Sequence, residues 1–339
     1  MAGIGTPDFW WSGPSLAAQM LRPAAALYGL ASGHKMSRPA RYTATVPIIC
    51  VGNFVVGGAG KTPVALALAD YLQSLGHVPG FLSRGYGGSL AGPTIVELAR
   101  HTAMEVGDEP LLLAESAKTL VARDRVAGAR ALEQSGVDVI VLDDGFQNPN
   151  LSKTQSWIVV DGTVGIGNGL CMPAGPLRVP LEIQLRQTDR IVVIGEGPGR
   201  EAMRTMCHAS NMELMTASLV PSIEEELRDQ SLLAYCGIGR PRKFFDTLAG
   251  AGLRIVGEVE FGDHHVVSED EARALLRRAE RDQAILVTTA KDMVRMKNAP
   301  GEAQRDLASK SAMVPVTCQF DDQDLVRRRL LEAMHHASG

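Results

Sequence analysis

A glycine-rich loop between an expected strand and an expected helix is the feature that most restricts the fold of this chain. Residues 46–52 (VPIICVG) form a short apolar run, and residues 61–75 are apolar nearly all round and are followed by Gly76. The segment that joins them, residues 52–62, has the sequence GNFVVGGAGKT. Glycines let backbone N–H groups turn toward phosphate oxygens, and a helix start adds partial positive charge there. The spacing therefore predicts a P-loop at the edge of an α/β sheet.

Two side chains at the end of this loop carry its chemistry. Lys61 is expected to reach the β- and γ-phosphates of a nucleotide, and the Thr62 hydroxyl is expected to bind Mg²⁺. The strict motif has glycine where this chain has Val55, so only its GGAGKT core is present. The alternative is a glycine-rich turn that binds nothing, and a Lys-Thr pair at a helix start argues against it. The residues expected to contact the nucleotide are Asn53, Gly57, Gly58, Ala59, Gly60, Lys61 and Thr62.

A pair of carboxylates follows another apolar run. Residues 137–143 (VDVIVLD) have the pattern of a buried strand, and Asp143 and Asp144 stand at its end. An acid at the end of a strand beside a P-loop can hold Mg²⁺. We expect this pair to form the metal site together with Thr62, and the sequence leaves open which of the two acids binds the metal.

Short apolar runs alternate with helical stretches along most of the chain, which predicts an α/β fold with a P-loop NTPase-like parallel sheet. At about 150 residues per domain, 339 residues correspond to roughly two domains. A stretch at 148–180 is rich in Gly and Pro, so we expect a P-loop domain at 1–150 and a second, smaller α/β domain at 151–319 that closes over the site. A C-terminal helix at about 320–339 is expected to return to the first domain. The expected strands are 46–52, 78–83, 94–97, 119–122, 137–143, 157–160, 190–194, 231–236, 254–260, 284–289 and 313–317.

Composition excludes several classes of protein. With 34 Lys and Arg against 38 Asp and Glu, the formal net charge is −4, and 45% of residues are hydrophobic. These values exclude a disordered chain, a collagen and a coiled coil, and they argue against a dedicated nucleic-acid-binding protein. The five cysteines show no paired spacing, which favours a reduced chain without disulfides or a zinc site. No segment has the ~18 to 20 apolar residues that span a bilayer.

The N-terminal region differs from this average. Residues 9–69 contain no Asp or Glu, whereas they contain five Lys and Arg residues, and Trp10 and Trp11 lie at their start. An apolar helix at about 16–31 with aromatic anchors and neighbouring cations suits the surface of an anionic membrane. The alternative is a helix that packs on the domain through its aromatic residues. The sequence supports both interpretations equally.

Seven motifs occur in one order along the chain, and together they resemble the tetraacyldisaccharide 4'-kinase family of lipid A biosynthesis. They are VGNFVVGGAGKTP, LSRGYGG (82–88), VGDEP (106–110), LDDGFQ (142–147), PAGPLR (173–178), FGDHH (261–265) and TTAKDMV (288–294). The resemblance extends from the N-terminal helix to about residue 297. It implies transfer of the γ-phosphate of ATP, with Mg²⁺, to the 4'-hydroxyl of a tetraacylated glucosamine disaccharide 1-phosphate. It also implies a peripheral protein on the cytoplasmic face of the bacterial inner membrane.

The resemblance also implies roles for individual residues. Asp108 would be the general base, although Asp108 and Glu109 could equally serve as first-turn charges of a helix. One of the two adjacent histidines, with His264 favoured over His265, would tune this base. Arg178 would contact a phosphate, although it could also be a solvated loop residue. The remaining residues implied to line the substrate site are Ser83, Arg84, Tyr86 and Glu109.

Four further positions have no firm role. Lys291 and Asp292 suit a surface ion pair, whereas the resemblance suggests a contact with the nucleotide or one that closes the domains. Asn148 and Val179 stand where the family pattern has other residues, so a catalytic role for these two is in doubt.

A rival function belongs to another class: a P-loop ATPase or GTPase that acts as a membrane-recruited switch without a small-molecule acceptor. The ordered kinase-like motifs and the lack of a metal-binding Cys/His tract argue against it.

Overall fold

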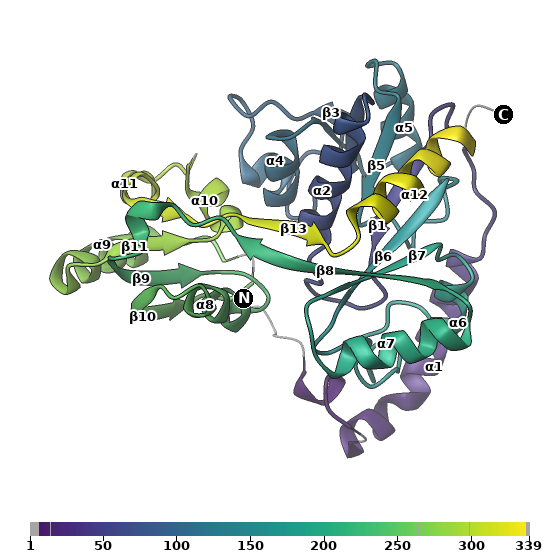
Figure 1. Cartoon of the computed structure of the whole chain (residues 1–339), viewed down its shortest axis with the longest axis horizontal. Coiled ribbons are helices and arrows are strands. Elements are labelled where there is room, and N and C mark those ends of the chain that lie inside the picture. Colours follow the sequence, from purple (N-terminus) through teal and green to yellow (C-terminus); the bar gives the residue numbers. More distant parts are fainter. Residues whose placement is uncertain (1–6, 14, 264, 298, 337–339) are drawn as a thin grey trace.

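Two β-sheets, each covered by helices, make up the computed structural model of this chain (Figure 1). The structure describes residues 7–13, 15–263, 265–297 and 299–336. One sheet is large and mostly parallel, and the other is smaller. The expected α/β class, with a P-loop NTPase-like sheet and a second smaller α/β unit, is confirmed.

The large sheet has the strand order β13-β8-β7-β6-β1-β5-β2-β4-β3. Neighbouring strands are parallel, except that β3 runs antiparallel to β4 and β13 runs antiparallel to β8. The central strands are buried on both faces, which explains their nearly continuous apolar sequences. The strands are β1 (Ile48–Gly52), β2 (Pro79–Ser83), β3 (Thr94–Ile95), β4 (Lys118–Val121), β5 (Val139–Asp143), β6 (Gln155–Asp161), β7 (Arg190–Ile194), β8 (Glu213–Pro221) and β13 (Val316–Phe320).

Helices cover both faces of this sheet. On one face, α2 (Lys61–Ser74), α4 (Asp108–Ala114) and α12 (Gln323–His336) contribute to a single apolar core. On the other face, α1 (Leu16–Met36), α5 (Arg125–Glu133), α6 (Leu181–Leu185) and α7 (Pro198–Ala209) contribute to a second core. The short helices η1 (Asp8–Trp10) and α3 (Ala103–Val106) precede α1 and α4.

The small sheet has the order β10-β9-β11-β12 and is parallel throughout. Its strands are β9 (Ser231–Cys236), β10 (Arg254–Glu260), β11 (Ile285–Thr288) and β12 (Ser311–Met313). One face packs against α8 (Pro241–Gly250), and the other packs against α9 (Glu269–Asp282) and α11 (Glu302–Lys310). The helix α10 (Ala290–Lys297) contacts α3 and α4 of the large unit, and η2 (Glu225–Leu227) lies in the link that enters the small one.

The boundary expected near residue 150 does not coincide with the division between the sheets. Strands β6, β7 and β8 all belong to the large sheet, so the Gly- and Pro-rich stretch at 148–180 is a loop within that unit. The strand expected at 313–317 is in fact two strands, since β12 joins the small sheet and β13 the large one. We therefore propose a P-loop domain formed by 7–221 and 316–336, and a second domain formed by 222–315.

Helix α1 has one packed face and one exposed face. Gly29 and Gly33 let it approach α6 closely, because a Cβ atom at Gly33 would lie 2.6 Å from Ile183. Its other face exposes Leu16, Met20, Leu27 and Leu30, which are 71–75% accessible. Among the described residues, no helix is long and apolar enough to cross a membrane.

Candidate functional site

Several of the expected site residues lie along one edge of the large sheet. Strands β6, β1, β5 and β2 are parallel neighbours, so their carboxyl ends meet at the same edge. The P-loop follows β1, Asp143 ends β5, and Ser83 ends β2. Ligands of open α/β sheets bind at this edge, and here the second domain lies against it.

The P-loop runs from the end of β1 to the start of α2. Gly57 and Gly60 have φ angles of +111° and +87°, which side chains strongly disfavour. The Asn53 amide donates to the Gly57 carbonyl at 3.1 Å and closes the loop. Val55, where the strict motif has glycine, is buried and forms a β-bridge with Leu177. The valine that stands in place of the motif glycine therefore packs against the PAGPLR loop.

Asp144 faces the two cations that the sequence places near the phosphates. Its carboxylate lies 3.8 Å from Lys61 Nζ and accepts a hydrogen bond of 2.8 Å from Arg178 Nη1. Burial alone would raise the pKa of Asp144, but Lys61 and Arg178 outweigh it and hold the pKa below its ordinary value. Arg178 also donates to the Val55 carbonyl at 3.1 Å, so this guanidinium is fixed against the P-loop.

Asp143 is in the opposite situation. It is 1% exposed, and neither carboxylate oxygen has a hydrogen-bond partner within the described part of the chain. Burial, aided by the negative charges of Glu109 and Asp144, raises the pKa of Asp143 to about 7, although Lys61 and Lys291 oppose the rise. A buried carboxylate without partners is costly, so a bound cation would be strongly favoured here. Carboxylate oxygens and the Thr62 hydroxyl are hard ligands that suit Mg²⁺.

The α4 carboxylates contact the second domain rather than solvent. Asp108 is buried and forms an ion pair with Arg295 of α10, with Arg295 Nε 3.0 Å from Asp108 Oδ2. Glu109 accepts a hydrogen bond of 2.6 Å from Lys291 of the same helix. Lys291 thus joins the two domains and is no surface ion pair, whereas Asp292 binds Arg295 within its own helix.

A second contact between the domains lies at the end of β6. Asp161 is buried there and pairs with Arg240 at 2.9 Å and with Lys243 at 3.0 Å, at the start of α8. The Arg240 guanidinium also lies over the Trp11 ring, 5.2 Å from its centroid. The second domain therefore touches the site edge near β6 as well as at α4.

The other expected residues have varied surroundings. Ser83 is buried, whereas Arg84 and Tyr86 are exposed after β2. His264 lies outside the described residues. His265 stacks on the Phe261 ring and binds Glu271 Oε2 at 2.9 Å, at the start of α9, so its contacts are structural.

The two positions that depart from the family pattern also have structural contacts. The Asn148 side chain accepts from the Asn150 amide at 2.9 Å within a turn, and Val179 is buried in the core. Neither position needs a catalytic role to account for its contacts.

Sequence reasoning missed several residues of this site. Gln147 donates to the Asn53 carbonyl at 2.7 Å, and Gln184 donates to the Phe54 carbonyl at 3.2 Å, so both amides support the P-loop. Asp161 and Arg295 were missed as well, because each pairs with a residue far away in sequence. One signal was available for Arg295: it lies four residues after Lys291, which places both on one face of a helix.

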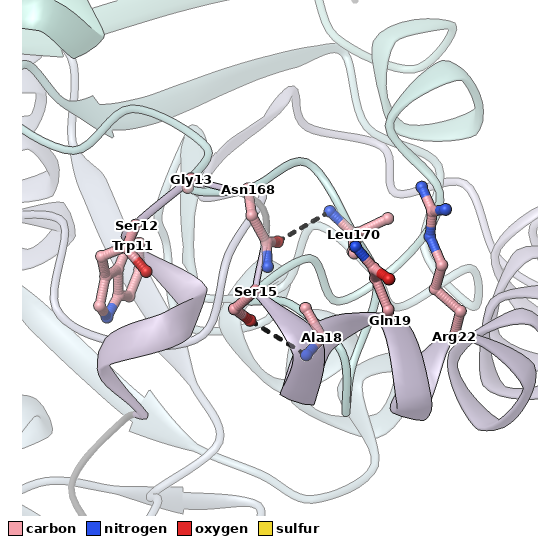
Figure 2. Close-up of a pocket in the computed structure, with 10 residues that line it drawn as sticks. Trp11, Ser12, Gly13, Ser15, Ala18, Gln19, Arg22, Asn168 and Leu170 are labelled. Carbon is pink, nitrogen blue, oxygen red and sulfur yellow. Dashed lines mark hydrogen bonds between the residues drawn. The ribbon is translucent and has the colours of Figure 1, made fainter.

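A cavity of about 620 Å³ lies beside α1 rather than at the P-loop (Figure 2). Ser15, Gln19 and Arg22 line it from α1 and its N-cap, and Asn168 and Leu170 line it from the opposite loop. The same loop holds η1, because the Asn168 amide N–H donates to the Trp10 carbonyl at 2.8 Å.

These features define a P-loop protein of the α/β class, with a lysine at the phosphate loop and a strand-end acid beside it. The family described as tetraacyldisaccharide-1-P 4'-kinase matches residues 17–335. The chain belongs to this family, as the ordered motifs indicated.

Individual relatives agree with this assignment. The tetraacyldisaccharide 4'-kinase of Methylorubrum extorquens (strain PA1) is 48% identical over 332 residues, which are 98% of this chain and 99% of the relative. That of Rhodopseudomonas palustris (strain BisB18) is 44% identical over 335 residues, which are 98% and 96% of the two chains. The crystal structure of "apo" form LpxK from Aquifex aeolicus in complex with ATP has the same fold. It matches with a TM-score of 0.70 at 22% identity, over 94% of this chain and 100% of that chain.

Proposed function

We propose that this protein transfers the γ-phosphate of ATP to the 4'-hydroxyl of a tetraacylated glucosamine disaccharide 1-phosphate in lipid A biosynthesis. The observation that carries the proposal is the grouping of Lys61, Asp143 and the α4 carboxylates at one sheet edge, in a chain of this kinase family. The rival reading, a switch without an acceptor, is disfavoured by that family membership.

The P-loop residues would bind the nucleotide. Lys61 and Arg178 would neutralise charge on the phosphate oxygens, and Asp144 would orient these two cations. Residues Asn53, Gly57, Gly58, Ala59 and Gly60 would form the loop around the phosphates.

A divalent cation is part of the proposal. Thr62 and Asp143 would hold Mg²⁺. The Asp143 oxygens have no hydrogen-bond partner among the described residues, which favours this acid over Asp144 as the metal ligand. Bound there, Mg²⁺ would supply positive charge beside the β- and γ-phosphates.

Asp108 would act as the general base. It would accept the proton of the 4'-hydroxyl while the sugar oxygen bonds to the γ-phosphorus and the bond to the β-phosphate oxygen breaks, which releases ADP. Ser83, Arg84, Tyr86 and Glu109 would line the acceptor side. For His264, the proposed tuning of Asp108 rests on the motif alone.

Incubation with γ-labelled ATP and the lipid disaccharide 1-phosphate tests this function. We expect the label to move into the lipid, because the second domain would keep water from the γ-phosphate. The matched control is the same lipid with its 4'-hydroxyl already phosphorylated, which should take up no label. Label released only as free phosphate would contradict the kinase.

We further propose that α1 binds the protein peripherally to the cytoplasmic face of the inner membrane. The exposed leucines of α1 would enter the interface, and exposed Arg22, Lys35, Arg38 and Arg41 would meet anionic lipid headgroups. Residues of the same helix line the cavity beside α1, and this position suits a substrate that arrives from the membrane.

Replacing Leu27 and Leu30 together by Glu is expected to abolish co-sedimentation with phosphatidylglycerol vesicles. Both side chains are exposed, so the fold should tolerate the change. Leu98→Glu, at an exposed site outside α1, is the control and should bind as the unaltered protein does. Undiminished binding of the double variant would favour the interpretation of α1 as a purely packed helix.

A further inference from the structure

An arginine of the second domain holds the carboxylate of the P-loop domain that we assign as the base. Arg295 lies in the last turn of α10 and its side chain is 7% exposed. Its Nε and Nη2 atoms both donate to Asp108 Oδ2, the former at 3.0 Å. The two residues are 187 positions apart and lie in helices of different domains, α4 and α10. The contact therefore exists only when the domains lie together.

The second domain fixes this guanidinium independently of Asp108. Arg295 Nη1 donates to Asp292 Oδ1 at 2.9 Å and to the Gly237 carbonyl at 2.7 Å. Asp292 in turn accepts from the Gly237 amide at 3.0 Å and from Thr289 Oγ1 at 2.6 Å. The orientation of the planar guanidinium is thus set by the loop that follows β9 and by α10.

The contacts of the Asp108 carboxylate restrict its orientation as well. One oxygen faces Arg295, and the other accepts from the Glu109 amide at 3.0 Å. The neighbouring ion pair, Lys291 with Glu109, joins the same two helices, and Val294 packs in one apolar cluster with Leu111 and Leu112. Charged and apolar contacts together hold α10 against α4.

We propose that Arg295, held by Asp292 and Gly237, is a positioning residue for Asp108. The inference rests on the proposed function, in which Asp108 is the base. The P-loop domain supplies the carboxylate, and closure of the second domain fixes its orientation toward the acceptor hydroxyl. Proton acceptance is thereby tied to the closed arrangement, while nucleotide binding at the P-loop is not.

Kinetics of Arg295→Gln and Arg295→Lys test this role. A misplaced base can cost up to ~10²-fold, so we expect Arg295→Gln to lower kcat by about 10- to 100-fold. KM for ATP should stay unchanged, and Arg295→Lys should recover part of kcat, since it restores the charge with fewer contacts. Arg277→Met, an exposed position on α9, is the control and should keep both constants.

A double-mutant cycle with Asp108→Asn separates positioning from a general loss of structure. If Arg295 acts through Asp108, Arg295→Gln should lower kcat no further in the Asp108→Asn background. An undiminished further loss there, or an unchanged kcat in Arg295→Gln, would overturn the inference. If Arg295→Gln does not fold, Asp292→Asn takes its place, with a lowered kcat expected and an unchanged kcat as the refuting result. Failure of the proposed function would look different, because the unaltered protein would then not phosphorylate the lipid.

Discussion

Replacing Asp108 with asparagine is expected to lower kcat for phosphate transfer by ~10²- to 10⁴-fold, the usual contribution of a general base. Asparagine has nearly the shape of aspartate, and its carbonyl oxygen can still accept a hydrogen bond from Arg295. The substitution therefore removes proton acceptance and leaves the contact between the domains in place. The affinity for ATP should be unchanged, because nucleotide binding is assigned to the P-loop.

Single-turnover transfer to the lipid measures the first quantity, and calorimetric titration with ATP measures the second. Asp306→Asn, at a half-exposed position of α11 where the carboxylate pairs with Lys310, is the matched control and should retain full activity. Transfer by Asp108→Asn at the rate of the unaltered protein would remove Asp108 as the base.

Replacing Asp143 with asparagine is expected to have two opposite effects. Transfer should fall by ~10²- to 10³-fold, the range seen when one preorganised electrostatic group is removed. The metal-free protein should nevertheless become more resistant to heat at pH 8, because a neutral amide replaces a buried carboxylate charge that has no hydrogen-bond partner in the described parts of the chain. Residues selected for binding a cation often destabilise the protein that lacks it.

The pH dependence of this stability difference follows from the raised pKa of Asp143. The folded state keeps the proton up to about pH 7, whereas the unfolded chain releases it near the ordinary value of 3.8. The contribution of Asp143 to the stability of the unaltered protein therefore falls as the pH rises from about 4 to 7, and this loss is complete above that range. The gain in Tm of Asp143→Asn should be largest at pH 8 and should shrink toward pH 5.

Asp144 provides a control for which the opposite change in Tm is expected. Asp144 is ion-paired with Lys61 and Arg178, so Asp144→Asn should lower the Tm of the metal-free protein at pH 8. Thermal unfolding in the presence of a chelator measures both variants. A Tm for Asp143→Asn below that of the unaltered protein at pH 8 would contradict our account of this carboxylate.

Local sequence was sufficient to predict the P-loop and its flanking strand and helix. A continuous apolar run before a glycine loop has few other structural solutions, so the bounds of β1 and α2 agree closely with expectation. Strand β8 was missed, because Glu213, Thr216 and Ser218 interrupt its apolar pattern near the edge of the sheet. An apolar strand also does not indicate which sheet it joins, which is why the boundary expected near residue 150 differs from the division between the two sheets.

Contacts between distant residues could not be predicted in the same way. Asp143 and Asp144 are adjacent, and only the backbone turn, with φ of +48° at Asp144, separates their surroundings. Arg295 has no motif of its own, and its pairing with Asp108 depends on how the two domains meet. The sequence therefore indicated which residue types lie at the site, whereas only the structure shows which residues each of them contacts.

The antiparallel pair β8 and β13 shows where the second domain is connected to the large sheet. Pro221, the last residue of β8, pairs with Val316, the first residue of β13. The chain therefore leaves the large sheet and re-enters it at two directly opposite residues. Directly opposite residues of such a pair have Cα atoms about 5 Å apart. Residues 222–315 thus occupy the place of a hairpin turn, with β8 and β13 extending side by side toward them (Figure 1). The large sheet would be complete with a tight turn in their place, so the residues that hold Asp108 belong to a segment inserted at a single point of the large sheet.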